Sequence, residues 1–154
     1  MVNSESAGSP LGDGGMKLWQ KEKASLKEVE QFTVGNDREL DIYLAPFDVL
    51  GSLAHIKMLE SVGLLSKDEL RSLEKELKEI YAQITSGRFK LDEGVEDIHS
   101  QVELMLTQKL GDVGKKIHSA RSRNDQVLVD LKLYMRGEIE KLVVSTKGLF
   151  DLLI

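Results

Sequence analysis

The side chains best suited to chemistry are concentrated in residues 115–130, which have the sequence KKIHSARSRNDQVLVD. Almost every side chain from His118 to Gln126 can donate a hydrogen bond, and several are cationic. The stretch leads into a long helix with apolar periodicity. A helix N-terminus attracts anions through its free backbone N–H groups and its dipole. These features favour a site for a carboxylate-bearing ligand.

The same stretch also allows a simpler interpretation. A basic, polar segment can be a solvated loop whose only structural role is to cap the next helix. Asn124 is then the natural N-cap, with Asp125 at the first helical position. Residue types alone leave the anion site and the solvated loop equally open.

A second candidate for chemistry is His99, in a helix predicted over residues 95–110 with the sequence VEDIHSQVELMLTQKL. Glu96, His99 and Glu103 are spaced by three and four, so they share a face, and Glu96 and Asp97 fall in the first turn. Two carboxylates flanking His99 should favour its protonated form. His99 is therefore either a positioned acid–base or substrate-binding group, or part of a surface ion-pair ladder. Only one Glu-x-x-His is present, whereas di-metal bundles need two with further Glu residues, so we predict no metal site.

Helices must position these groups, and apolar spacing predicts an all-α chain. Pro46 should interrupt a first long helix over residues 40–62, with a stop near Leu44 and a new start at Pro46, and Gly63 should end it. His55 on this helix is expected to be packed and hydrogen-bonded rather than a ligand. The other predicted helices are a short one over residues 25–32, one that a Ser66–Glu69 capping box starts and Gly87 ends, the one over residues 95–110, and a long one from Asn124 onward.

The last predicted helix carries a heptad-like apolar seam over about seven turns. A helix this long and apolar needs partners, and the chain stops in the middle of the seam. We therefore expect a truncated bundle helix, or one built to assemble with other helices. The seam consists of Leu128, Leu131, Met135, Ile139, Leu142, Thr146, Leu149 and Leu153.

Composition excludes several classes of function. The 154 residues carry a net charge of −5 and no cysteine, which argues against disulfides, thiolate metal sites and bulk attraction to nucleic acid or anionic membranes. The basic patch Arg121–Arg123 is short and lacks interleaved aromatic residues, so nucleic-acid binding is disfavoured. No stretch has the length of a transmembrane helix, and no signal peptide is visible, so a cytoplasmic location is expected. The Gly/Ser-rich residues 1–15 are predicted to be a disordered leader.

The sequence HSARSRNDQVLVDLKLYMR, from His118 onward, resembles the signature of argininosuccinate lyase in the fumarase/aspartase superfamily. Three more segments match this family in order: Leu18-Trp19, FDVLGSLAH at residues 47–55 and EDIH at residues 96–99. The resemblance implies an all-helical homotetramer that cleaves argininosuccinate to arginine and fumarate by β-elimination, without metal or organic cofactor. It also implies active sites where three subunits meet.

The same resemblance assigns roles to particular residues. It implies a substrate-binding loop made of Asn124, Arg123, Ser122, Arg121 and His118. Of these, Asn124 matches the Asn that binds substrate, and Arg123 and Ser122 match neighbours that face the substrate carboxylates. Asp97 and His99 match the motif beside the active site, where they are expected to support catalysis.

The chain departs from the family at two kinds of position. Residues 20–23, Gln-Lys-Glu-Lys, follow Trp19 in place of the usual Gly-Gly-Arg-Phe, and Asp37 lies nearest to an expected substrate-binding Ser. The motifs that hold the family's catalytic His and proton-abstracting Ser do not occur in these 154 residues. The resemblance thus implies a fragment without catalytic residues of its own, and we expect it to be inactive alone.

The expected organisation is an N-terminal helical lyase domain over residues 16–111, followed over residues 112–154 by the substrate-binding loop and the truncated first long helix of a central helical bundle. The alternative is a non-catalytic helical structural or interaction module of the same fold, since fold alone does not decide function.

Overall fold

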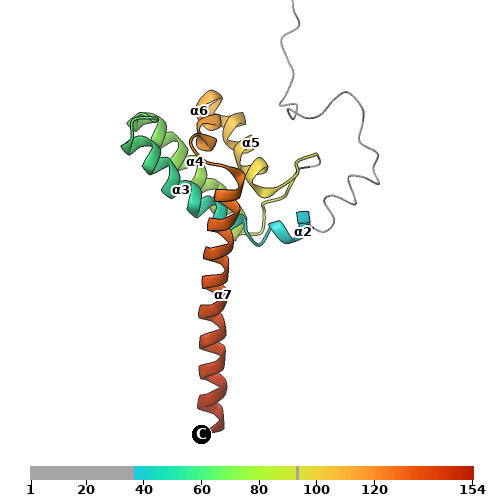
Figure 1. Cartoon of the computed structure of the whole chain (residues 1–154). Helices are drawn as coiled ribbons and strands as arrows, with labels where there is room; N and C mark the ends of the chain where they lie inside the picture. Colours follow the sequence, from blue (N-terminus) through green and yellow to red (C-terminus); the bar gives the residue numbers. More distant parts are fainter. Residues whose placement is uncertain (1–36, 93) are drawn as a thin grey trace, which may run out of the picture. The chain divides into compact units, whose positions relative to one another are not determined.

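The computed structural model describes residues 37–92 and 94–154, and the regular elements in these ranges are all helices (Figure 1). The all-α prediction is confirmed for this part of the chain. The predicted helix over residues 25–32, the leader and the altered residues 20–23 lie outside the described residues. The elements are α2 (Asp37–Asp41), α3 (Ala45–Ser61), α4 (Lys67–Thr85), α5 (Ile98–Leu110), α6 (Asp112–Lys115), a 3-10 turn (Lys116–His118) and α7 (Arg123–Leu153).

Helices α3 and α4 form a helical hairpin, and local sequence explains its ends. Pro46 lies in the first turn of α3, where its missing N–H costs no hydrogen bond. Gly63 follows the helix at a φ of +80°, and Leu64 N–H donates to Leu59 O at 2.9 Å, which closes the end of α3. Ser66 and Glu69 form the capping box that starts α4.

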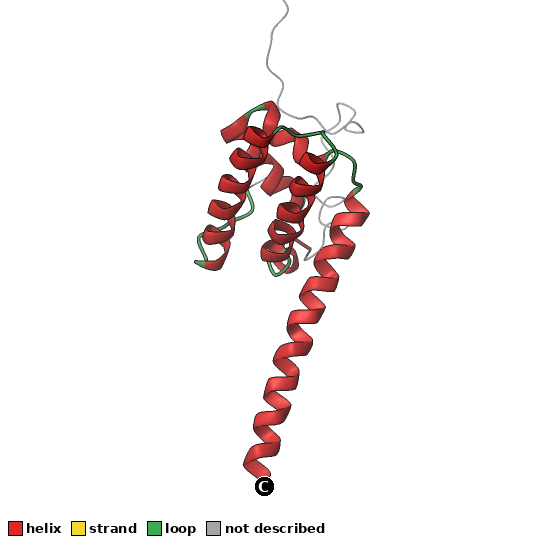
Figure 2. Ribbon diagram, turned by 90° about the vertical axis from the view of Figure 1, so that its left-hand side faces the viewer, coloured by secondary structure: helices red, strands yellow, loops and turns green. Residues whose placement is uncertain are grey.

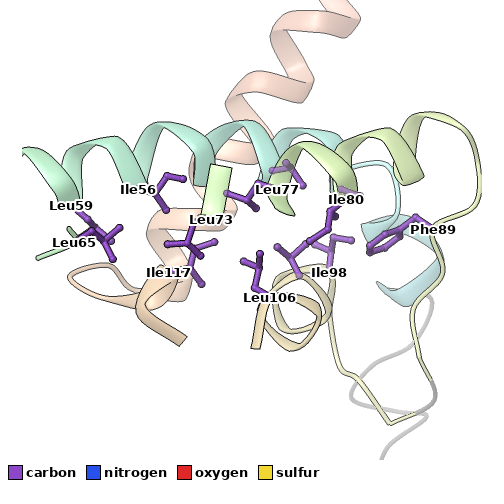
Figure 3. Packing of buried hydrophobic residues seen from close by; sticks show 13 residues of the cluster. Ile56, Leu59, Leu65, Leu73, Leu77, Ile80, Phe89, Ile98, Leu106 and Ile117 are labelled. Carbon is purple, nitrogen blue, oxygen red and sulfur yellow. The ribbon is translucent and has the colours of Figure 1, made fainter. Parts of the chain in front are cut away.

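The hydrophobic core lies between α3, α4 and α5, and the 3-10 turn adds Ile117 (Figure 3). Helix α4 supplies Leu73 and Leu77, both fully buried. From α5, Ile98 and Leu106 point into the same cluster. Non-directional burial of these side chains is the main force that holds the three helices together, at roughly 1.5–3 kcal/mol for each large side chain.

Predicted helix bounds are wrong by a few residues in three places. The segment expected from Leu40 to a stop near Leu44 is α2, which spans Asp37–Asp41. Helix α5 begins at Ile98 rather than Val95, because the Asp97 side chain accepts a hydrogen bond from Ser100 N–H at 2.8 Å and acts as N-cap. Helix α7 begins at Arg123, and its N-cap is Ser122 rather than Asn124. Ser122 and Asp125 form a capping box, which satisfies two backbone N–H groups where Asn124 would satisfy one.

Helix α7 has two parts with different surroundings. Its first turns pack against α3, and Gln126 and Asp130 are its buried residues. Farther along, the Tyr134 ring meets the Phe47 ring edge-on, with centroids 5.9 Å apart. The remainder extends beyond the other helices (Figure 2), and the predicted seam is exposed, with Leu142 at 66%.

Gly114 allows α6 to pack closely on α5, and this contact can be tested. A Cβ at this position would lie 2.5 Å from the backbone carbonyl of Leu106, so Gly114→Ala should force the two segments apart. We expect it to lower the free energy of unfolding by about 1–3 kcal/mol, measured by urea denaturation. Gly148→Ala is the matched control, because open space surrounds Gly148 on α7 and alanine should not destabilise there. Equal stability of the two variants would contradict the packing argument.

Candidate functional site

The loop before α7 is held by a histidine from α3. His55 Nε2 lies 2.8 Å from Ser119 O and donates to it, which confirms the prediction of a packed, hydrogen-bonded His55. Burial lowers the pKa of His55, and the charges of Arg121 and His118 lower it further against the opposing effect of the Ser119 bond. The neutral ring therefore anchors the loop without adding a charge to it.

Arg121 points from this loop into the interface between α3, α5 and α7. Its Nη2 donates to Ser52 Oγ on α3 at 3.2 Å. Burial lowers the pKa of Arg121, whereas the nearby carboxylates of Asp48 and Asp130 raise it. A guanidinium stays charged in proteins, so Arg121 brings a fixed positive charge to this interface.

Arg123 joins the starts of two helices. It is the first residue of α7, and its Nη2 donates to Ser100 Oγ in the first turn of α5 at 3.0 Å. Its Nε lies 3.5 Å from an oxygen of Asp97, the N-cap of α5. The side chain is thereby oriented before any ligand arrives, which reduces the entropy lost on binding.

His99 is buried, with 4% of its surface exposed, so its interpretation as part of a surface ion-pair ladder is wrong. Its Nδ1 donates to Asp48 Oδ1 on α3 at 2.9 Å, and Glu96 lies outside α5. Burial acts to lower the pKa of His99, but the hydrogen bond and charge of Asp48, together with Asp97, outweigh it and raise the pKa. The expected direction of the shift is confirmed, and its main cause is Asp48 rather than the flanking glutamates.

Asp48, Gln126 and Asp130 belong to this cluster but were not among the predicted site residues, although Gln126 and Asp130 lie within the stretch 115–130. Gln126 Nε2 donates to the same Asp48 oxygen at 3.1 Å, and Asp130 Oδ2 lies 3.6 Å from His99 Nδ1. A usable signal was present in α7, because Gln126 and Asp130 are four apart and share a face away from the apolar seam. Asp48 gave a weaker signal, a carboxylate on a helix face whose other buried residues, apart from Ser52, are apolar.

The five predicted loop residues do not all converge. His118 and Arg121 line one narrow depression with His99, Ser52 and Asp48. The remaining three lie at the start of α7: Ser122, Arg123 and Asn124. The Ser122 hydroxyl is used for capping, while the Asn124 side chain is exposed and makes no hydrogen bond to the described residues.

Unsatisfied polar atoms concentrate around this region. Five of the seven buried side-chain atoms that lack a hydrogen-bond partner within the described residues belong to it. Such an atom typically costs about 1–3 kcal/mol, so a cluster of them calls for an explanation. The five atoms are Asp48 Oδ2, Arg121 Nε, Arg123 Nη1, Gln126 Oε1 and Asp130 Oδ2.

A family model described as lyase matches residues 17–153. The chain belongs to this lyase family. No helix among the described residues of this lyase-family chain is both long and apolar enough to span a membrane.

Individual relatives confirm the resemblance found in the sequence. The chain is 63% identical over 138 residues to the argininosuccinate lyase of Parabacteroides distasonis and 62% identical to that of Bacteroides thetaiotaomicron, in each case over 90% of this chain. It is 43% identical to the argininosuccinate lyase of Thermotoga neapolitana over 82% of this chain. The chain spans about a third of the length of these relatives, 31–32%.

The backbone of the loop offers a test of its strain. Ala120 has a φ of +58°, where a Cβ costs about 1–2 kcal/mol. Ala120→Gly should therefore raise the free energy of unfolding by roughly 1 kcal/mol, measured by urea denaturation. The matched control is Ala54→Gly at an exposed position inside α3, where the same change should cost about 1 kcal/mol. A destabilised Ala120→Gly variant would argue against strain at this position.

Proposed function

We propose that this chain is an N-terminal portion of an argininosuccinate lyase, and that its residues 118–124 supply part of the substrate-binding surface for β-elimination of argininosuccinate to arginine and fumarate. One observation carries the proposal. Arg121 and Arg123 are held at the start of α7 by side chains of α3 and α5, and each keeps a buried N–H group without an acceptor among the described residues. The similarity to proteins named argininosuccinate lyase supports the choice of substrate.

The chemistry of the substrate suits this arrangement. Argininosuccinate carries several carboxylates, which guanidinium groups and a helix N-terminus bind well. In the proposed complex Arg123 and the first turn of α7 hold a carboxylate, and the exposed Asn124 amide contacts the substrate directly. Elimination through a carbanion places negative charge on a carboxylate, so fixed positive groups there also lower the barrier.

The base that abstracts the proton is not among the residues we propose for this surface. His99 is buried against Asp48 and serves, in our proposal, to support the site rather than to touch substrate. The printed sequence contains neither of the family motifs for the catalytic His and Ser. We therefore propose that residues 112–154 contribute binding groups and a bundle helix, and that these 154 residues have no turnover alone.

Complementation measures this contribution directly. The chain is mixed with the separately expressed remainder of the Parabacteroides distasonis enzyme, and fumarate absorbance is followed after argininosuccinate is added. We expect activity only in the mixture, and we expect Asn124→Ala to lower it by roughly 10²-fold because a substrate contact is lost. The exposed Asn124 side chain has no structural hydrogen bond, so the variant should fold normally. Gln108→Ala, which removes an exposed amide on α5, should keep the activity.

Two results of the complementation assay would contradict the proposal. Turnover by the chain alone would show that the base lies within it. No turnover in a mixture whose parts are helical by circular dichroism and associated by light scattering would favour the alternative, a non-catalytic helical structural module.

We propose further that the whole protein is a cytoplasmic homotetramer in which α7 packs in a central helical bundle. The exposed seam of α7 supports assembly, because apolar surface of this extent is seldom left in water. The tetramer follows from the family resemblance, and both the tetramer and the location are open to direct measurement.

Light scattering on this chain tests the seam. The chain should associate, and Leu142→Lys, at a seam position that is 66% exposed, should weaken association by placing a charge in an apolar contact. The control is Val144→Lys, at a position that is 71% exposed on another face of the same helix and should leave association unchanged. A monodisperse monomer in the unsubstituted chain would count against the seam as a contact surface.

A further inference from the structure

Three buried ionisable side chains meet where α3, α5 and α7 pack together. Asp48 comes from α3, His99 from α5 and Asp130 from α7, with 1%, 4% and 1% of their surfaces exposed. One nitrogen or oxygen atom of each lies within 4.8 Å of the others. Burial of charged groups is costly unless they are paired, so the protonation state of this cluster matters to the packing of all three helices.

The hydrogen bonds within the cluster are unevenly distributed. Asp48 Oδ1 accepts from both His99 Nδ1 and Gln126 Nε2. In contrast, Asp48 Oδ2 and Asp130 Oδ2 receive no hydrogen bond from the described residues. The imidazole of His99 lies near both carboxyl groups, but it cannot supply a hydrogen bond to Asp48 Oδ2 and Asp130 Oδ2 as well. One further hydrogen-bond donor between the two carboxyl groups is therefore missing. A single proton on one of the two carboxyls would provide it, as in pairs of closely spaced carboxyl groups.

Charged groups from every packed element act on Asp130. Burial has the largest effect and raises the pKa of Asp130, the charge of Asp48 also raises it, and His99 and Arg121 lower it, with a net value of about 7. From α2, Asp41 adds a smaller upward effect. Other charges act on the neighbours of Asp130. Glu103 raises the pKa of Arg121. Asp97 raises the pKa of His99, and Arg123 lowers it.

Arg121 also argues against a cation in this place. The donor atoms would suit a divalent ion, but a guanidinium already supplies positive charge to the two carboxylates. A second cation beside it would be repelled in a site that excludes water. A proton adds no volume and fits the closed packing.

We propose that Asp48, His99 and Asp130 form a buried proton-sharing cluster, called the clamp below. Asp130 keeps a proton in the folded chain and donates it in a hydrogen bond toward Asp48. As the pH rises Asp130 releases this proton to solvent, and the packing of α7 on α3 and α5 weakens. After release, two carboxylates face one imidazole, and their repulsion acts on the contact between α3 and α7. The clamp does not depend on the proposed enzymatic activity. It also positions the first turn of α7, which carries Arg123 and Asn124.

The sign of the pH effect follows from linkage. The folded chain holds a proton on Asp130 up to about pH 7, whereas the unfolded chain loses it near pH 4, so stability falls as the pH rises between these values. The pKa of His99 is also raised in the folded chain. Its contribution is present below the unfolded value and is lost as the pH rises through the folded one. Deprotonation of either group therefore lowers the free energy of unfolding as the pH rises.

Carbon-13 NMR of the aspartate side-chain carboxyls tests the clamp in this chain. We expect one carboxyl to titrate near pH 7 in the unsubstituted chain, and Asp130→Asn to remove that titration. Asp151→Asn is the matched control, because it removes an exposed aspartate from the same helix and should leave the titration in place. Ionisation of every aspartate below about pH 5.5 in the unsubstituted chain would overturn the proposal, even if Asp130→Asn failed to fold.

Urea unfolding as a function of pH gives a second, independent readout. Between about pH 5 and pH 7 the unfolding constant of the unsubstituted chain should rise relative to that of Asp130→Asn by close to tenfold per pH unit, the effect of one proton. Asp151→Asn should follow the unsubstituted chain. A purely structural role for Asp130 would lower stability equally at every pH, and parallel pH profiles would therefore contradict the clamp.

Discussion

The hydrogen bond from His99 to Asp48 is the contact on which the rest of the described structure depends, because it joins α5 to α3 in the place where α7 begins. The same Asp48 oxygen accepts from Gln126, so one carboxylate connects three helices. Removing one partner of a buried pair leaves an uncompensated charge, which typically costs about 3–5 kcal/mol. The apolar core alone could tolerate small sliding of the helices, since hydrophobic burial has no direction, whereas this bond fixes their relative position.

The candidate binding loop is built outward from that contact. Arg121 reaches back to Ser52 one turn beyond Asp48, Arg123 reaches across to the start of α5, and His55 holds the loop backbone at Ser119. The two guanidinium groups are thus oriented by rigid helices rather than by the loop itself. Orientation of this kind, set before the ligand binds, is what anion recognition and charge stabilisation in a transition state require.

Helix α7 links this site to the surface that we propose for assembly. Its first turns supply Arg123, Gln126 and Asp130 to the site, while its later turns present exposed apolar side chains such as Leu142 and Leu149. A change at either end of the helix acts on the same rigid element. The proposed substrate-binding surface and the proposed proton clamp therefore both depend on the position of α7, although they use different side chains of it, Arg123 and Asp130.

The sequence by itself determined the four longer helices α3, α4, α5 and α7 and their order, but not the short helix α6. Capping boxes, prolines and glycines act over three or four residues, as Ser66 with Glu69 and Pro46 illustrate. The sequence also identified the cationic stretch, since its residues are consecutive. The start of α7 was misplaced because Ser122 and Asn124 are both good caps, and the reciprocal bond to Asp125 decided between them. Only the tertiary structure brought Asp48 and Asp130 to His99. Asp48 and His99 are 51 residues apart in the sequence, and Asp48 and Gln126 are 78 apart. No local spacing reveals which face of one helix will meet which face of another.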